Sequence, residues 1–172
     1  MFGRKPSKPP PPDLVVQILT PEYLIDGYSN PEDNLFEYLC TADFDDDFNY
    51  TFKSTQVQST GTLSTPPFSC REWHGSFLSS IIALIPRDDA SLEATRAAFE
   101  DYEYPFRAEI FAGPYLVRGE LMSNIEDEPN YLTFAAVKDA EIESLLPGAK
   151  MSRLNSSLLI LNGMHIHGYY LV

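Results

Sequence analysis

Short apolar runs separated by polar turns recur along most of the chain, a pattern typical of β-strands. Apolar residues fill 14–19 and 77–85 almost without a break, as they do in buried strands. Thr20-Pro21-Glu22 ends the first run, and 23–28 then returns as a second strand. The sequence therefore predicts a mostly β protein with little α-helix.

One stretch, 89–102, has the period of an amphipathic helix instead. Asp88 or Asp89 can cap its N-terminus, and Pro105 stops it. Its apolar face would be formed by Leu92, Thr95, Phe99 and Tyr102. We expect this helix, within 87–105, to connect two β regions.

Those β regions resemble each other, which indicates an internal duplication. Tyr115-Leu116-Val117-Arg118-Gly119 matches Tyr23-Leu24-Ile25-Asp26-Gly27, and an Asn-x-Glu-Asp sequence follows each copy. A Tyr-Leu-x-x-Ala segment comes next, at 38–42 and 131–135, and four residues later the copies place Asp46 and Asp139. Further on, 156–161 matches 79–84.

The expected organisation is a first β repeat over 13–86, the connecting helix, and a second β repeat over 106–172. The extra length of the first repeat falls in a Ser/Thr-rich loop at 50–70, of which 51–57 could form an exposed hairpin strand. Each repeat alone has a small core, so we expect the two to pack on each other about a pseudo-twofold axis.

Local signals refine the two repeats. A glycine inside a strand marks a bulge or a sharp bend, so Gly27 and Gly119 predict a bend at the same place in each copy. Such bends curl short strands into a small barrel. Asn162-Gly163 predicts a two-residue hairpin turn before a last strand, and 139–146 a short helical turn.

Taken alone, the second repeat resembles the Sm-like small β-barrel. The resemblance rests on 116–119, Glu126-Asp127, 131–136, Asp139-Ala140 and 160–166. It implies two tandem Sm-like barrels, with nucleic-acid or nucleotide binding as one function. Sm-like proteins that bind RNA typically have Arg or Lys beside the glycine of the second motif, where this chain has Leu161-Asn162-Gly163-Met164.

Composition and net charge limit the classes of function that this chain can have. The 172 residues are 44% hydrophobic and 13% aromatic, enough for a core, and carry a net charge of −13. That charge disfavours binding to nucleic acid or to anionic membranes. Residues 1–12 include four consecutive prolines, and we expect them to form a disordered arm. With two cysteines, and neither a signal peptide nor a membrane-spanning run, we expect a cytoplasmic protein.

Two groups of side chains could hold a metal. His165 and His167 would lie on one face of the last strand, a spacing that metal sites use, and a metal-dependent enzyme built on them is the third functional hypothesis. The acidic cluster at 43–47 offers oxygen ligands but lacks the glycine and the glutamate of an EF-hand loop.

No nucleotide or nucleophile motif occurs, so we expect no catalytic residue and no cofactor. The leading hypothesis is a non-enzymatic protein-binding or scaffold module that uses an exposed strand edge or an apolar Tyr/Phe surface. The candidate binding residues are Trp73, which would cover the barrel mouth, and Tyr115 and Arg118 of the repeated motif. A homo-oligomer is one form that such binding could take.

Overall fold

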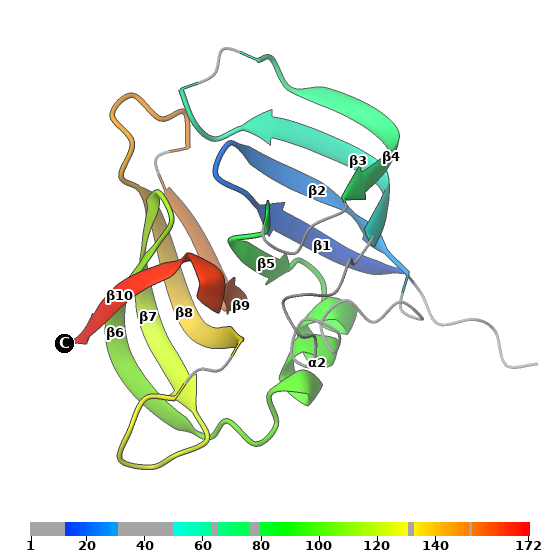
Figure 1. Ribbon diagram of the computed structural model, residues 1–172. Helices are drawn as coiled ribbons and strands as arrows, with labels where there is room; N and C mark the ends of the chain where they lie inside the picture. The colour runs from blue at the N-terminus through cyan, green and yellow to red at the C-terminus, as the bar shows by residue number, and fades with distance from the viewer. Residues whose placement is uncertain (1–12, 31–49, 63–64, 76–79, 131–132, 152) are drawn as a thin grey trace, which may run out of the picture.

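The computed structural model describes residues 13–30, 50–62, 65–75, 80–130, 133–151 and 153–172. They form one open antiparallel sheet of ten strands with an α-helix packed against it, so the prediction of a mostly β protein is confirmed (Figure 1). The strands are β1 (Leu14–Leu19), β2 (Tyr23–Ser29), β3 (Tyr50–Ser59), β4 (Phe68–Gly75), β5 (Ala83–Pro86), β6 (Tyr104–Ala112), β7 (Tyr115–Ser123), β8 (Phe134–Ser144), β9 (Arg153–Asn162) and β10 (Ile166–Leu171). The helix α2 spans Asp89–Ala98, and a 3₁₀ turn, η3, spans Gly163–His165.

Across the sheet the strand order is β10-β6-β7-β8-β9-β5-β1-β2-β3-β4. The first half (β1–β5) and the second half (β6–β10) therefore follow the same path, in which four strands run as a meander and the fifth returns to pair with the first. The halves meet at the junction between β9 and β5, which are the fourth strand of one half and the fifth of the other. A two-fold axis would pair like strands. The predicted pseudo-twofold arrangement is therefore wrong.

Both halves bend at the same point of this path. The pairing of β2 with β3 shifts register at Gly27, and that of β7 with β8 shifts at Gly119, as the two glycines predicted. Beside these bulges lie the two non-glycine residues of the described chain that have a left-handed φ, Ser54 at 50° and Asp139 at 47°. Each bulge thus combines a glycine on one strand with a left-handed residue on the next.

The strand positions correct the expected alignment of the copies. Ser54 on β3, not Asp46, occupies the place of Asp139, and Asp46 lies outside the described residues. The match of 79–84 with 156–161 is also wrong for its described residues, 80–84, because 156–161 belongs to β9, the neighbour of β5 and the counterpart of β4. Their similarity has a physical reason: both flank the junction, where side chains are buried on both faces of the sheet.

Two expected loops or turns are also strands. The hairpin strand considered at 51–57 is confirmed as part of β3, but β3 and the start of β4 take up most of 50–70, which was expected as a long loop. Polar residues cover one face of β3, while Phe52 and Val57 are buried on the other. The helical turn expected at 139–146 is wrong because β8 continues to Ser144, with Ala140 and Ile142 in the core.

The connection between β9 and β10 also differs from the expected two-residue turn. Asn162 has φ −77°, and its side-chain oxygen accepts a hydrogen bond from the N–H of Met164 at 3.0 Å. Its side-chain nitrogen donates to the carbonyl oxygen of Ile81 at 3.0 Å. Asn162 therefore caps the turn η3 and ties it to the first half, rather than adopting the left-handed conformation of a tight hairpin.

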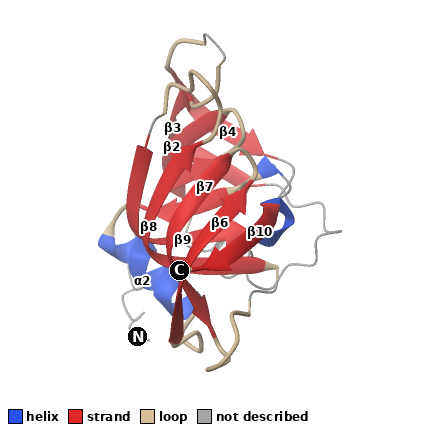
Figure 2. Cartoon of the chain, turned by 90° about the vertical axis from the view of Figure 1, so that its left-hand side faces the viewer, coloured by secondary structure: helices blue, strands red, loops and turns tan. Residues whose placement is uncertain are grey.

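Each half has a core that extends across the junction. The first core contains apolar residues of β1–β3 and of the second half, including Leu158 and Ile160. The second core contains those of β6–β9 and of the first half, including Ala83 and Ile85. The helix α2, which confirms the predicted connecting helix, packs against β1, β5 and β9 on one side of the sheet (Figure 2). Its N-cap is Asp88, whose carboxylate accepts from the N–H of Ser91 at 2.8 Å.

Replacing Gly119 by alanine tests the bulge. The added methyl group would lie 2.6 Å from the carbonyl oxygen of Lys138 and 2.7 Å from Cγ1 of Val137, so the two strands would have to separate. We expect Gly119→Ala to lower the free energy of unfolding by about 1–3 kcal/mol in urea titrations. In the matched variant Gly168→Ala the methyl group meets nothing within 4 Å, and the change should stay within about 0.5 kcal/mol. Equal effects of the two substitutions would contradict a tight bulge.

Candidate functional site

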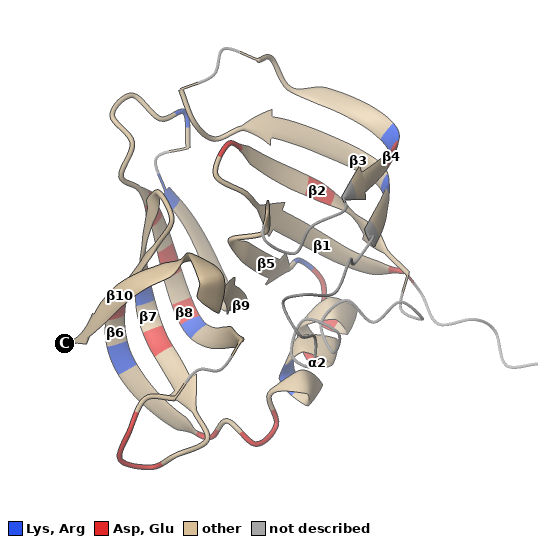
Figure 3. Cartoon of the chain, viewed as in Figure 1, with Lys and Arg blue, Asp and Glu red and all other residues tan. Residues whose placement is uncertain are grey.

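One edge of the sheet is apolar and open. Strand β10 pairs with β6 on one side and forms the end of the sheet on the other. Large parts of Tyr170 (50%), Leu171 (51%) and Val172 (72%) are exposed. The strand carries no Lys, Arg, Asp or Glu (Figure 3). Proteins commonly protect a free edge with charged residues, because unpaired N–H and C=O groups invite another strand. The edge at β10 lacks that protection.

The equivalent strand of the first half, β5, is covered. Leu84 pairs with Ile18 of β1 just as Tyr169 pairs with Ile110 of β6, and Ile85 therefore corresponds to Tyr170. β9 pairs with the other side of β5 and α2 packs over one of its faces, and Leu84 and Ile85 are fully buried. The same position in the strand path is thus completed by a neighbouring strand in one half and left open in the other.

The main chain of β10 is oriented for pairing. The N–H of Val172 donates to the carbonyl oxygen of Arg107 on β6 at 3.0 Å, and in the first half the N–H of Arg87 donates to Val15 at the same distance. Main-chain groups of successive residues in a strand point to opposite sides. The N–H and C=O of Leu171 therefore point away from β6, toward the open side of the edge.

The opposite edge of the sheet, β4, is polar. Arg71, Glu72 and His74 are exposed there. The ring of His74 is held by Oγ1 of Thr51 at 3.1 Å and lies 3.6 Å from the carboxylate of Glu72. Apart from Phe68 at its start, this edge carries the charges that β10 lacks.

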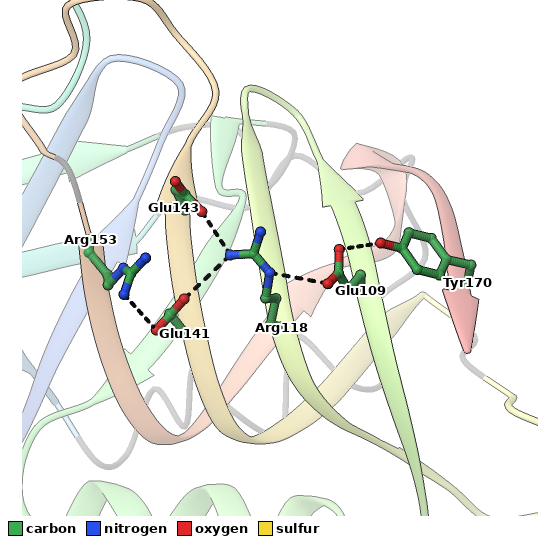
Figure 4. Close-up of polar contacts among 6 residues, drawn as sticks. All are labelled: Glu109, Arg118, Glu141, Glu143, Arg153 and Tyr170. Carbon is green, nitrogen blue, oxygen red and sulfur yellow. Dashed lines mark hydrogen bonds and ion pairs between the residues drawn. The ribbon is translucent and has the colours of Figure 1, made fainter. Parts of the chain in front are cut away.

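Behind β10, Arg118 on β7 is the centre of a cluster of carboxylates (Figure 4). Its guanidinium lies 3.2 Å from Glu109 on β6, and 3.3 and 2.7 Å from Glu141 and Glu143 on β8. Arg153 on β9 adds a contact of 3.3 Å to Glu141. The cluster therefore links four neighbouring strands on one face of the second half.

The cluster also holds the edge strand, because the hydroxyl of Tyr170 donates a hydrogen bond to Glu109. This bond, together with Arg118, lowers the pKa of Glu109, and it raises the pKa of Tyr170. Arg118 lowers the pKa of Glu143. Glu109 and Glu143 are therefore held in their charged form, and Tyr170 has a fixed orientation at the edge.

A hollow of about 480 Å³ lies over this face, lined in part by Arg107, Arg118, Glu120 and Asp139. Arg118 already contacts three carboxylates, so an incoming anion would have to displace one of them. The arrangement suits a structural support for β10 better than a binding pocket.

The structure does not bring the three predicted binding residues together. Tyr115 is fully buried, and its hydroxyl lies 3.0 Å from the carbonyl oxygen of Thr20 and 2.9 Å from Oγ1 of Thr60, both in the first half. Burial raises its pKa. Trp73 is half-buried on β4 against the first core. Arg118 alone lies near the open edge.

The predicted histidine pair is not on one strand face, because His165 belongs to the turn η3 and only His167 to β10. Among the described residues no group of three His, Cys, Asp or Glu side chains is close enough to hold a metal ion. The acidic cluster at 43–47 lies outside the described residues.

Sequence reasoning expected an exposed strand edge but did not place it at β10, and it missed the partners of Arg118. The run Tyr169-Tyr170-Leu171-Val172 was a visible signal, but only the strand order shows that it lies at an edge. No family model, curated protein or solved structure matches this chain. No helix among the described residues has the length and apolar character needed to cross a bilayer.

Replacing Arg118 by methionine tests the cluster. Because Arg118 lowers the pKa of Glu143 in the folded protein, the contact stabilises the fold above the ordinary carboxylate pKa of 4.5 and is lost as the pH falls through the lowered value. We expect Arg118→Met to destabilise the protein in urea titrations near neutral pH, and the difference from wild type to shrink below about pH 4.5.

The control is Arg107→Met, which removes an arginine of the same hollow that makes no ion pair with any described residue. It should have little effect at either pH. A loss caused by Arg118→Met that grows toward acid would contradict the cluster.

Proposed function

We propose that this protein is a non-enzymatic protein-binding module that binds its partner by strand addition to β10. The observation that carries the proposal is the contrast between the covered β5 and the open β10. Leu84 and Ile85 are fully buried in the first half, whereas Tyr169 and Tyr170, at the same positions of the strand path in the second half, are 37% and 50% exposed. A partner strand would cover them and would pair along β10 as far as Leu171. This is farther than the ladder of β9 on β5, which ends at Leu84, before Pro86 at the position equivalent to Leu171.

The Arg118 cluster supports this function. Strand addition is stronger when the edge is rigid, because less conformational entropy is lost on binding. Tyr170 is fixed through Glu109 and Arg118 to β6 and β7, so the edge is ordered before a partner arrives. Three carboxylates compensate Arg118, which suits a support rather than a catalytic group.

We also infer that the module arose by duplication of one bent five-stranded unit. The repeated strand order and the matching bulges at Gly27 and Gly119 support this origin. The Sm-like resemblance of the second repeat carries a second candidate function, binding of nucleic acid. The net charge of −13 opposes that function. Retention of a fluorescent RNA at low salt, abolished by moderate salt, would favour it over the protein-binding module.

Leu171→Pro tests strand addition. Proline removes the N–H that points away from β6 and leaves the β6 ladder intact, whereas the matched variant Leu171→Ala shortens the side chain and keeps the N–H. Immobilised wild type, Leu171→Ala and Leu171→Pro would capture partners from an extract of the source cells, quantified by mass spectrometry. Since one main-chain hydrogen bond contributes about 1 kcal/mol, Leu171→Pro should reduce recovery at least about fivefold.

Recovery with Leu171→Ala should stay closer to wild type. Equal recovery with wild type and Leu171→Pro, or capture of no specific partner by wild type, would contradict the proposal.

A further inference from the structure

The two strands at the free edges of the sheet are the counterparts of the two strands that pair at the junction. At the junction, the fourth strand of the second half, β9, pairs with the fifth strand of the first half, β5. The strands left at the ends are β4, the fourth strand of the first half, and β10, the fifth strand of the second. A contact between unlike strands can be repeated from copy to copy without any new kind of interface.

We propose that β4 of one copy pairs antiparallel with β10 of the next, so that the chains assemble head to tail through a repeat of the junction. This inference rests on the proposed function, because it names a second copy of this chain as the partner strand for β10. If the rotation that relates one copy to the next closes after a few copies, the assembly is a ring; if it does not close, the assembly is a filament.

The register of the contact follows from the junction. Ile160 pairs with Leu84, and Leu161 with Ala83. Leu159 pairs with Val137 two residues before Asp139, just as Trp73 pairs with Phe52 two residues before Ser54. His74 therefore takes the place of Ile160. Since Tyr169 takes the place of Leu84, the contact sets His74 opposite Tyr169.

The same register places Gly75 opposite Gly168 and leaves both backbones room to approach. Neither β4 nor β10 has a proline to interrupt the ladder.

The side chains at these edges fit the two faces of such a contact. On one face of the junction, Ile85 lies with Leu159 in the second core. Tyr170 takes the place of Ile85 and Trp73 takes that of Leu159, so in the contact Tyr170 would lie near Trp73 of the next copy. There it would extend the apolar end of that copy's first core. On the other face, α2 covers Leu158 and Ile160 at the junction, and the described residues include no second helix to do this for β4. That face of β4 would meet water, where the exposed Glu72 and His74 are suited to lie.

A cysteine pair tests both the contact and its register. In a background with Cys40→Ser and Cys70→Ser, the double variant His74→Cys with Tyr169→Cys would place two thiols on opposite strands, within reach of a disulfide between copies. After mild oxidation we expect the mass on a non-reducing gel to shift from 19.4 kDa to a series of its multiples, or to one closed multiple. Each single variant should remain at the mass of one chain or show at most weak dimer.

Thermal unfolding of each variant, followed by circular dichroism, checks that these edge substitutions leave the fold intact. A folded double variant that forms no cross-links would overturn the head-to-tail assembly. So would efficient dimerisation of Tyr169→Cys alone, which would mean that β10 pairs with β10 about a two-fold axis.

The two proposals can fail separately. If the double variant stays monomeric while Leu171→Pro still loses a captured protein, β10 binds a different partner and only the head-to-tail assembly is wrong. If the folded double variant forms no cross-links and Leu171→Pro leaves capture unchanged, β10 is not a binding edge, and both proposals fail.

Discussion

The pairing of β9 with β5 is the interaction on which the rest of this molecule depends. It turns two five-stranded units into one sheet and closes the edge of each unit that would otherwise be open on that side. Both cores cross it, and the buried hydroxyl of Tyr115 reaches from the second half to Thr20 and Thr60 of the first. A unit of five strands has a small core, so each half gains the apolar surface it lacks from its neighbour.

The same pairing decides where function can lie. Because it joins unlike strands, the molecule is left with one open edge of each kind, a polar one at β4 and an apolar one at β10. The Arg118 cluster then stabilises the second half on the face behind β10, through side chains of β6, β7, β8 and β10. The open edge and its support are thus consequences of strand order.

The sequence predicted those features whose causes are local. Asp88 capped the expected helix, and Gly27 and Gly119 marked both bends. The sequence signal for strand β3 was weak because its exposed face consists of Ser, Thr and Gln. The predicted match of Asp46 with Asp139 followed a local sequence similarity that the strand pairing does not support. The carboxylates around Arg118 could not be predicted, since Glu109 and Glu143 come together only through the register of three strands.

Amide hydrogen exchange at the junction tests this account most directly. The N–H of Asn162 donates to the carbonyl oxygen of Ile82 at 2.9 Å, across the line where the halves meet. If the junction holds the two halves in one cooperative unit, this amide should exchange only through global unfolding, as slowly as the amides of Ile25 and Val117 in the two cores. Exchange of Asn162 through a low-energy opening, while Ile25 and Val117 stay protected, would show that the halves fold separately and would contradict the account.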